Sequence, residues 1–198
     1  MKPTTTLNYY NNNAIDFVTT TRNVDFTTIQ KAFTKHLPPA ATILDFGCGS
    51  GRDTRYFLDQ GFLVNAIDGS SELCKLATEY TGIEVTCMQF QDIEVLNRYN
   101  GIWACSSILH LPIEELKIVF IKLAAALKRN GIVYTSFKYG DFEGYRDDRY
   151  FIDMTEEKFI NLLDEIQVFD MEKIWITSDV RPGRDDEKWL NVIVRKKN

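Results

Sequence analysis

Residues 42–51, which read Thr-Ile-Leu-Asp-Phe-Gly-Cys-Gly-Ser-Gly, decide the fold of this 198-residue chain. An apolar, β-prone run leads into Asp45, and a helical pattern begins at Arg52. Three glycines lie between them at alternate positions: Gly47, Gly49 and Gly51. Glycine permits a sharp turn and lets a ligand lie against bare backbone, where any Cβ would intrude. The stretch therefore predicts a buried strand, a ligand-binding turn and a helix, in that order.

Asp68 follows a second strand-like run, residues 62–67. A carboxylate at that position can accept hydrogen bonds from both hydroxyls of a ribose. A dinucleotide site is the first alternative, but its G-x-G-x-x-G fingerprint requires glycine where this chain has Arg52. Asp45 would also repel a pyrophosphate, whereas it suits a ligand that carries an ammonium group. The sequence therefore disfavours a nicotinamide-linked oxidoreductase.

The glycine stretch and the second acid resemble the first two motifs of the class I S-adenosylmethionine-dependent methyltransferases. The matching residues are Asp45, Gly47, Gly49 and Gly51 for the first motif and Asp68 for the second. The resemblance extends over about residues 8–198, with specific motifs only within 42–110. It implies a Rossmann-like fold, S-adenosylmethionine as the cofactor and methyl transfer as the reaction. The alternative is a chance glycine-rich turn in another α/β protein.

The same resemblance implies which residues hold the cofactor. Arg52, at the helix start, suits the methionine carboxylate, although a surface position on the helix would equally explain it. Asp92 resembles the family's residue that hydrogen-bonds the adenine amino group, with a helix N-cap as the alternative. The expected cofactor-binding set is Asp45, Gly47, Gly49, Gly51, Arg52, Asp68, Gly69, Ser70, Asp92 and Ser106.

Two residues are candidates for the reaction itself. His110 follows the fourth expected strand, where the family lines the acceptor pocket, and a neutral imidazole there can act as a general base. A packed, hydrogen-bonded histidine is the alternative, and an acceptor that is already a thiolate, selenide or amine needs no base. Tyr10 belongs to the pattern Tyr10-x-x-x-Ala14-x-x-Phe17, which resembles the lid of small-molecule methyltransferases. A mobile polar tail is the alternative for that segment.

Strand-like and helix-like periods alternate along the chain after residue 42. The expected strands cover about 42–46, 62–67, 83–88, 101–105, 132–137, 166–176 and 190–194. The expected helices cover about 52–59, 70–80, 114–128 and 155–164, after one that opens at Asp25 and stops before Pro38. The alternation predicts an α/β, Rossmann-like, seven-stranded and mostly parallel sheet with an antiparallel terminal hairpin and helices on both faces.

A chain of this length is expected to form one domain, residues 1–198. Its expected parts are an N-terminal lid and helix (1–37), a cofactor-binding core (42–137), a substrate-side loop (138–154) and a terminal helix and hairpin (155–198). The 138–154 segment has no helical or strand period, and loops of that length are commonly functional.

Several cations fall near the expected cofactor side of the sheet: Lys138, Arg146, Arg149, Arg181 and Arg184. Together they would bind an anionic acceptor. Acidic residues are interleaved with them, and this pattern instead favours a mixed-charge, solvated rim.

Composition disfavours other classes. The formal net charge of −5 argues against nucleic-acid binding. No apolar stretch approaches the ~20 residues that span a bilayer, and no signal-peptide core is visible near the N-terminus. The cysteines have no C-x-x-C spacing and the histidines lie far from any pair, so no metal site is expected. The four cysteines lie in apolar contexts, which favours reduced thiols in a cytoplasmic protein.

The expected function is therefore methyl transfer from S-adenosylmethionine to a small-molecule acceptor. Residues 104–107 lack the Asn/Asp-Pro-Pro-Tyr/Phe motif of enzymes that methylate adenine or glutamine, which disfavours that chemistry. The Gly51-Arg52-Asp53 helix start and the Leu109-His110 pair resemble the tellurite-resistance methyltransferase-like subgroup. The rival is a non-catalytic module or partner subunit that binds S-adenosylmethionine or S-adenosylhomocysteine. The sequence leaves the acceptor and the oligomeric state open.

Overall fold

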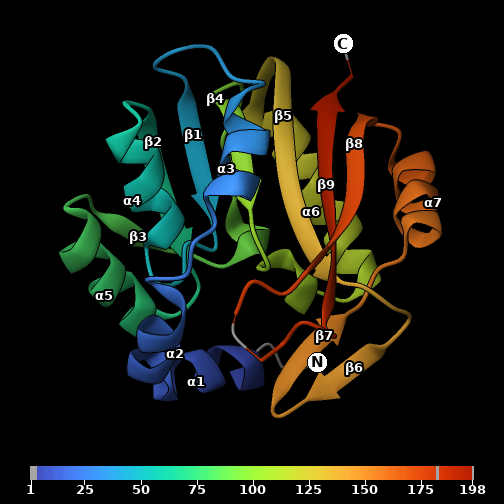
Figure 1. Ribbon diagram of the computed structural model, residues 1–198. Coiled ribbons are helices and arrows are strands. Elements are labelled where there is room, and N and C mark those ends of the chain that lie inside the picture. The colour runs from blue at the N-terminus through green and yellow to red at the C-terminus, as the bar shows by residue number, and fades with distance from the viewer. Residues whose placement is uncertain (1–3, 182, 198) are drawn as a thin grey trace.

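The computed structural model describes residues 4–181 and 183–197, which form a seven-stranded sheet flanked by helices (Figure 1). The strand order is β3-β2-β1-β4-β5-β9-β8. The strands from β3 to β5 are parallel, whereas β9 is antiparallel to both β5 and β8. This arrangement confirms the expected sheet and its terminal hairpin. The strands are β1 (Thr42–Phe46), β2 (Leu63–Asp68), β3 (Val85–Cys87), β4 (Tyr99–Ala104), β5 (Leu127–Lys138), β8 (Phe169–Ser178) and β9 (Lys188–Lys196).

Helices cover both faces of the sheet, as expected: α3, α4 and α5 lie on one face, and α6 and α7 lie on the other (Figure 1). Polar side chains fix where two of them begin. The Ser70 hydroxyl accepts the Leu73 N–H at the start of α5, and Thr155 does the same for Lys158 at the start of α7. The bounds are α1 (Thr4–Asn12), α2 (Ala14–Thr21), α3 (Thr27–Thr34), α4 (Arg52–Asp59), α5 (Ser71–Thr81), α6 (Ile113–Ala126), α7 (Glu156–Ile166) and the 3₁₀ turns η1 (Phe90–Asp92) and η2 (Ile108–His110).

Alternation along the central strands sorts their side chains into two cores. Ile43 of β1 packs with Trp103 and Tyr134 beneath α3 and α4, while its neighbour Leu44 packs on the α6 side. The Trp103 and Tyr134 rings stack with their centroids 4.0 Å apart. Both faces of β1, β4 and β5 are covered, so residues 43–46, 101–104 and 131–137 are all buried and most of their side chains are apolar.

One helix end differs from the expectation. A helix was predicted to residue 128, but β5 begins at Leu127. Leu127 pairs with Tyr99 of β4, and the Ala126 carbonyl accepts the Arg98 N–H at 2.8 Å. Pairing with β4 therefore supplies the hydrogen bonds that another helical turn would have made. The β3 strand is also shorter than the predicted 83–88.

The predicted irregular loop at 138–154 is wrong. β5 extends through Lys138, and β6 (Glu143–Arg146) and β7 (Arg149–Ile152) form an antiparallel hairpin. Asp147 and Asp148, which join them, have φ angles of 46° and 61°, as a two-residue type I′ turn requires. Aspartate tolerates this left-handed region because its short side chain hydrogen-bonds locally.

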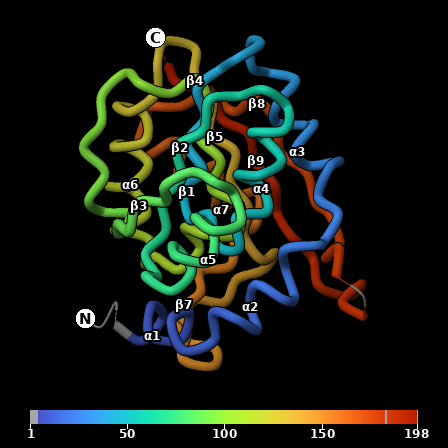
Figure 2. Tube along the Cα trace, turned by 90° about the vertical axis from the view of Figure 1, so that its left-hand side faces the viewer, coloured from blue at the N-terminus to red at the C-terminus, as the bar shows by residue number. Residues whose placement is uncertain are grey.

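Two segments that are distant in sequence lie together beyond the carboxyl ends of the parallel strands (Figure 1, Figure 2). They are the α1–α2 pair and the β6–β7 hairpin, and α1 contacts both α5 and β7. The Tyr150 N–H donates to Thr6 Oγ1 at 3.0 Å, across 144 residues of sequence. The sequence predicted a lid in residues 1–37, of which 1–3 lie outside the described residues, as does Pro182 of the β8–β9 turn.

The aromatic core beneath α3 predicts a large loss of stability on truncation. Phe33 is fully buried, with its ring 5.2 Å from Trp103 and 5.8 Å from Phe57. We expect Phe33→Ala to lower the free energy of unfolding by about 3–5 kcal/mol, because it removes buried area and leaves a cavity. Urea denaturation followed by circular dichroism measures it. The control Ile118→Ala, at a site that is 54% exposed, should change the free energy by less than about 0.5 kcal/mol.

Candidate active site

A cavity of about 410 Å³ opens at the carboxyl ends of the parallel strands, where ligands bind in sheets of this kind. Its floor comes from the turn after β1, the end of β2 and the segment after β4. The α1–α2 pair and the β6–β7 hairpin form its roof, and the β8–β9 turn closes one side. The cavity is therefore enclosed by segments that are far apart in the sequence and meet at this edge of the sheet.

Gly47 and Gly49 form part of the cavity wall and require glycine for steric reasons. A Cβ on Gly47 would lie 2.4 Å from the Ser107 Cβ, and one on Gly49 would lie 2.9 Å from the Phe17 ring. Both residues have positive φ, 88° and 54°. The N–H groups of Gly47 and Cys48 donate to the Ile67 carbonyl, which ties the turn to β2. Both glycines line the cavity, and packing against Ser107 and Phe17 already requires glycine at these positions. Their contact with a ligand stays a prediction.

Asp68, at the end of β2, lies on the cavity wall. The Gly49 N–H donates to Oδ2 and the Ser70 N–H donates to Oδ1, each at 2.9 Å. Burial raises the pKa of this carboxyl, and the backbone hydrogen bonds from Ser70 and Gly49 counter part of that effect. Backbone donors therefore hold this carboxyl group in place on the cavity wall, and its two oxygens together have about four acceptor sites, which suits vicinal hydroxyls.

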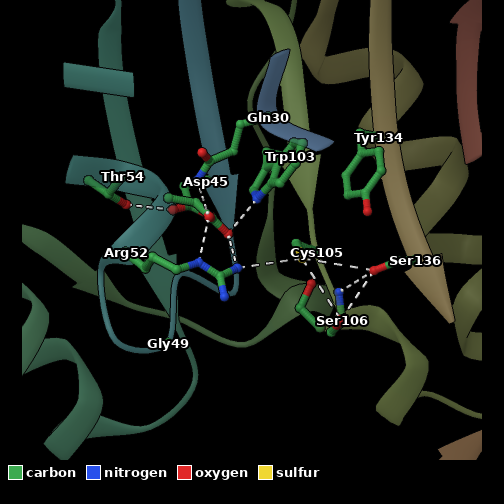
Figure 3. A network of polar contacts seen from close by, with 12 residues as sticks. Gln30, Asp45, Gly49, Arg52, Thr54, Trp103, Cys105, Ser106, Tyr134 and Ser136 are labelled. Carbon is green, nitrogen blue, oxygen red and sulfur yellow. Dashed lines mark hydrogen bonds and ion pairs between the residues drawn. The ribbon is translucent and has the colours of Figure 1, made fainter. Parts of the chain in front are cut away.

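Asp53 is the centre of a buried polar network, and its partners Gln30, Arg52 and Trp103 are labelled in Figure 3. Arg52 donates to both of its oxygens, at 2.9 and 2.8 Å. Gln30 Nε2 and Trp103 Nε1 donate to the same carboxylate at 2.7 and 2.8 Å. Burial opposes ionisation of Asp53, but the Arg52 charge and these donors outweigh it and lower the pKa. Asp53 is therefore an anion whose partners come from α3, α4 and β4.

Arg52 and Asp45 each have partners within the protein. Arg52 lies on the cavity wall, but its guanidinium is paired with Asp53 and lies 4.3 Å from the Phe26 ring centroid. Asp45 is buried behind the glycine turn and accepts a 2.5 Å hydrogen bond from the Thr54 hydroxyl. Burial, followed by the Asp53 charge, raises the pKa of Asp45 well above its usual range. Their contacts with the cofactor stay predictions.

The remaining predicted cofactor residues divide between the cavity wall and its support. Gly69 and Ser106 line the cavity. Gly51 instead faces α5, where a Cβ would lie 2.8 Å from Thr81, and Ser70 caps α5 while its hydroxyl bonds Asn11 Oδ1 at 2.7 Å. Asp92 is exposed at the end of η1, so the alternative of a helix N-cap does not hold, and Gln89, Phe90 and Gln91 line the cavity beside it. The adenine contact of Asp92 stays a prediction.

Ser106 lies in a strained turn directly after β4. Its φ is 50°, which is uncommon for a residue with a side chain, and its N–H donates to the Ser136 hydroxyl at 2.9 Å. Cys105 beside it is half-buried and lines the cavity (Figure 3). Desolvation raises the pKa of its thiol to about 12. Cys105 is therefore an inert thiol near neutral pH, and the turn directs Ser106 toward the cavity.

His110 and Tyr10 meet at the cavity, as the sequence predicted. The Tyr10 hydroxyl lies 2.8 Å from His110 Nε2, and the Tyr150 carbonyl oxygen lies 2.6 Å from Nδ1. A carbonyl can only accept, so Nδ1 carries the proton and Nε2 accepts from the Tyr10 hydroxyl. Burial is the main reason that the pKa of His110 falls to about 4. The imidazole is therefore neutral near pH 7.

The α1–α2 pair packs directly on the glycine positions. Leu7 covers Gly69, where a Cβ would lie 2.7 Å from it, and Phe17 covers Gly49. Asn11 Oδ1 accepts hydrogen bonds from the Ser70 hydroxyl and the Glu72 N–H at the start of α5. The polar N-terminal stretch is thus held at several points, and Tyr10 is directed into the cavity by the same helix.

Most of the predicted cationic side chains have acidic partners. Arg146 pairs with Asp153 and does not line the cavity, while Lys138 and Arg181 line it and pair with Glu187 and Asp179. These pairs support the mixed-charge interpretation. Sequence reasoning missed Trp189 and Asp179 on the cavity wall, where the Trp189 Nε1–H donates to Asp179 at 3.0 Å. The one feature of the sequence that could have indicated these two residues is that they lie close to the Arg181–Arg184 turn.

The described residues contain neither a candidate metal cluster nor a candidate membrane-spanning helix. In residues 4–181 and 183–197, no cluster of three or more histidine, cysteine, aspartate or glutamate side chains is arranged to hold a metal ion. Within the same residues, none of the helices has the length and apolar character needed to cross a bilayer.

Sequence comparison relates the chain to methyltransferases. Residues 43–131 match the model of a family described as a methyltransferase domain. The chain is also 36% identical, over 120 residues, to 2-methyl-6-phytyl-1,4-hydroquinone methyltransferase of Synechocystis sp.. That match covers 57% of this chain and 35% of the relative, so the chain spans little more than a third of the length of this curated relative.

Structural comparison places the fold among the same proteins. A Burkholderia thailandensis 1,6-didemethyltoxoflavin-N1-methyltransferase, solved with 1,6-didemethyltoxoflavin and S-adenosylhomocysteine, superposes with a TM-score of 0.79 at 22% identity, covering 98% of this chain and 88% of that one. Magnesium protoporphyrin IX methyltransferase of Synechocystis, with bound S-adenosylmethionine, superposes with a TM-score of 0.71 at 16% identity, covering 96% and 94%. At these identities the likeness establishes the fold.

The Asp53 network predicts that removing its cation destabilises the protein. Arg52→Met leaves a buried carboxylate without its charge partner, and we expect it to lower the free energy of unfolding by about 3–5 kcal/mol. Arg55→Met is the matched control on the same helix, because Arg55 pairs with Asp59 at the surface and its side chain is 38% exposed. The control should cost about 1 kcal/mol or less in the same urea titration. Equal losses would contradict the central role of the buried pair.

Proposed function

Because residues 43–131 carry a methyltransferase domain on the class I S-adenosylmethionine-dependent methyltransferase fold, we propose that the protein methylates a small-molecule acceptor with S-adenosylmethionine. The observation that carries the proposal is the pairing of the bare glycine turn with Asp68 on one cavity wall. Gly47 and Gly49 line the same cavity as Asp68, whose carboxyl group offers acceptors to the hydroxyls of a ribose.

The residues at the cavity fit the parts of this cofactor. Asp68 would hold the ribose, while Gln89, Phe90 and Gln91 offer an apolar ring and amide groups where a base would lie beside it. When bound, the cofactor supplies an electrophilic methyl group on a sulfonium. The protein's own contribution is then to exclude water and to hold the acceptor in line, which supplies much of the rate in a bimolecular transfer.

The roof of the cavity suits that task. α1, α2 and the β6–β7 hairpin enclose the site, and Tyr10 projects from α1 onto His110. Closure by these segments excludes bulk water and orders the acceptor between lid and floor. The lid role of residues 1–37, the substrate-side role of 138–154 and the membership of the tellurite-resistance methyltransferase-like subgroup are parts of this proposal.

The rival proposal is a non-catalytic module that binds the cofactor and serves as a sensor or as a partner subunit. A cofactor sensor needs no second compartment, yet here the cavity continues past His110 to the β6–β7 hairpin and the β8–β9 turn. The compartment is lined by aromatic and polar side chains, among them Tyr145, Tyr150 and Trp189. A metabolite screen with a coupled homocysteine-release assay separates the two proposals, since turnover of any acceptor eliminates the rival.

We also propose that the protein works in the cytoplasm, on small molecules and without nucleic acid. All four cysteines are free thiols, as expected in a reducing compartment. The net charge of −5 disfavours contact with a polyanion.

Cofactor binding predicts a measurable effect of Asp68. We expect titration calorimetry to detect S-adenosylhomocysteine binding, and Asp68→Asn to weaken it by about tenfold or more, because the variant loses a charged acceptor for the ribose hydroxyls. Asp59→Asn, on the exposed end of α4, is the matched control and should bind normally. Asp92→Asn, measured beside them, tests the adenine contact. No binding by folded wild-type protein would refute the proposed function.

A further inference from the structure

Arg149 is the cavity cation whose charge is left without an acidic partner. It lies at the start of β7 and on the cavity wall. Its guanidinium carbon is 4.3 Å from the Tyr9 ring centroid and 5.2 Å from that of Phe151. Its Nε is buried and has no hydrogen-bond partner, and within residues 4–181 and 183–197 no carboxylate lies at ion-pair distance from it. A desolvated cation of this kind favours an anionic ligand.

The other cations on the cavity wall all have an acidic neighbour, and two of them, Lys138 and Arg184, share Glu187. Arg52 pairs with Asp53, Arg181 with Asp179, and Lys138 with Glu187. Arg184 is more exposed and lies 3.5 Å from Glu187. An anion entering the cavity would therefore meet one cation that is both partly buried and free of acids, and that cation is beside the Tyr10–His110 contact.

The Tyr10–His110 contact is poorly suited to accept a proton. Nδ1 of His110 already donates to the Tyr150 carbonyl, and Nε2 already accepts from Tyr10. Burial lowers the pKa of His110 to about 4, and the Arg149 charge acts in the same direction. Burial likewise raises the pKa of Tyr10 to about 12, so its hydroxyl keeps its proton. A proton released by an acceptor would have to create an imidazolium beside a guanidinium.

These two observations are complementary, because a site without an effective base but with an unpaired cation suits an acceptor that is already ionised. We propose that the protein takes its acceptor as an anion, a phenolate or enolate whose charged oxygen lies against Arg149. The inference rests on the proposed function. It makes Arg149 the residue that selects the ionised acceptor, and it makes His110 a neutral positioning residue that holds Tyr10.

Methyl transfer to such an acceptor balances without a proton. A lone pair of the charged oxygen forms the bond to the methyl carbon, and the carbon–sulfur bond leaves its electron pair on sulfur. The anionic acceptor gains a methyl group and the sulfonium becomes a neutral thioether. The oxygen that lies against Arg149 is therefore uncharged once transfer is complete. Product release from this pocket is therefore favoured over release of the acceptor.

The groups that face Arg149 and His110 define what else could influence ionisation there. On the lid and cofactor side they are Tyr9, Tyr10 and Asp68. On the hairpin side the group is Tyr150, whose own pKa is raised by burial and by the charges of Glu143 and Glu115. The Asp68 charge raises the pKa of Tyr10, whereas the Arg149 charge lowers it. The positive charge is therefore on the hairpin side of the cavity.

A coloured probe tests the proposal through its ionisation and without turnover. 4-Nitrophenol is colourless and its phenolate is yellow, and about one unit below its own pKa roughly a tenth is ionised in buffer. We expect protein saturated with S-adenosylhomocysteine to increase the yellow fraction, because an adjacent cation lowers the pKa of a bound phenol by at least about one unit. Arg149→Met should abolish the increase, and Arg149→Lys should restore most of it.

The matched control is Arg184→Met, which removes a cation from the same cavity and should leave the increase largely intact. The proposal is overturned if wild-type protein leaves the probe colourless, if Arg149→Met behaves as wild type, or if Arg184→Met loses as much as Arg149→Met. Calorimetry with S-adenosylhomocysteine on each sample is the separate check. Samples that bind it are folded, and wild-type protein that fails to bind it refutes the proposed function instead.

Discussion

The structure depends on one buried carboxylate. Asp53 lies at the first turn of α4, and its four hydrogen bonds come from Arg52, Gln30 and Trp103. An unpaired charge at this depth would cost several kcal/mol, so the fold is stable only when all of these donors are in place. The network thereby fixes the end of the glycine turn against β4 and α3. The shape of the cofactor side of the cavity follows from that constraint.

The cavity roof is held by a different kind of interaction. No large apolar core joins α1–α2 to the β6–β7 hairpin; the contacts are single hydrogen bonds and ring contacts, such as Thr6 with Tyr150 and Tyr9 with Arg149. Each is worth on the order of 1 kcal/mol. Each half of the roof is instead fixed to the floor by apolar packing, because Ala14 and Val18 cluster with Leu73 of α5 while Phe151 and Ile152 of β7 belong to the main core. The two halves are therefore anchored separately, and only single contacts join them across the cavity.

The sequence predicted the floor well and the roof poorly, for a physical reason. β1 and α4 have the predicted bounds, 42–46 and 52–59, because the apolar run, the glycines and the helical period are local signals that agree with the tertiary structure. The β6–β7 hairpin was missed because its strands have four residues each and its Asp147-Asp148 turn is a weaker signal than Asn-Gly. Asp45 shows a further limit: sequence places it beside the turn, but burial and Thr54 decide that it points away from the cavity.

The charge distribution of the cavity follows from these same elements. Asp68 brings a carboxyl group to the glycine side, the Arg52–Asp53 pair is neutral overall, and the hairpin brings the Arg149 cation to the opposite side. Between them, Tyr10 and His110 form a hydrogen-bonded pair without net charge. The gradient runs from acidic at the floor to basic at the roof, which is complementary to a cationic ligand below an anionic one. Arg149 is carried by the hairpin, and its guanidinium carbon lies 4.3 Å from the ring centroid of Tyr9 on α1. The residue that supplies the positive charge on the anionic side is thus also a contact between the two halves of the roof.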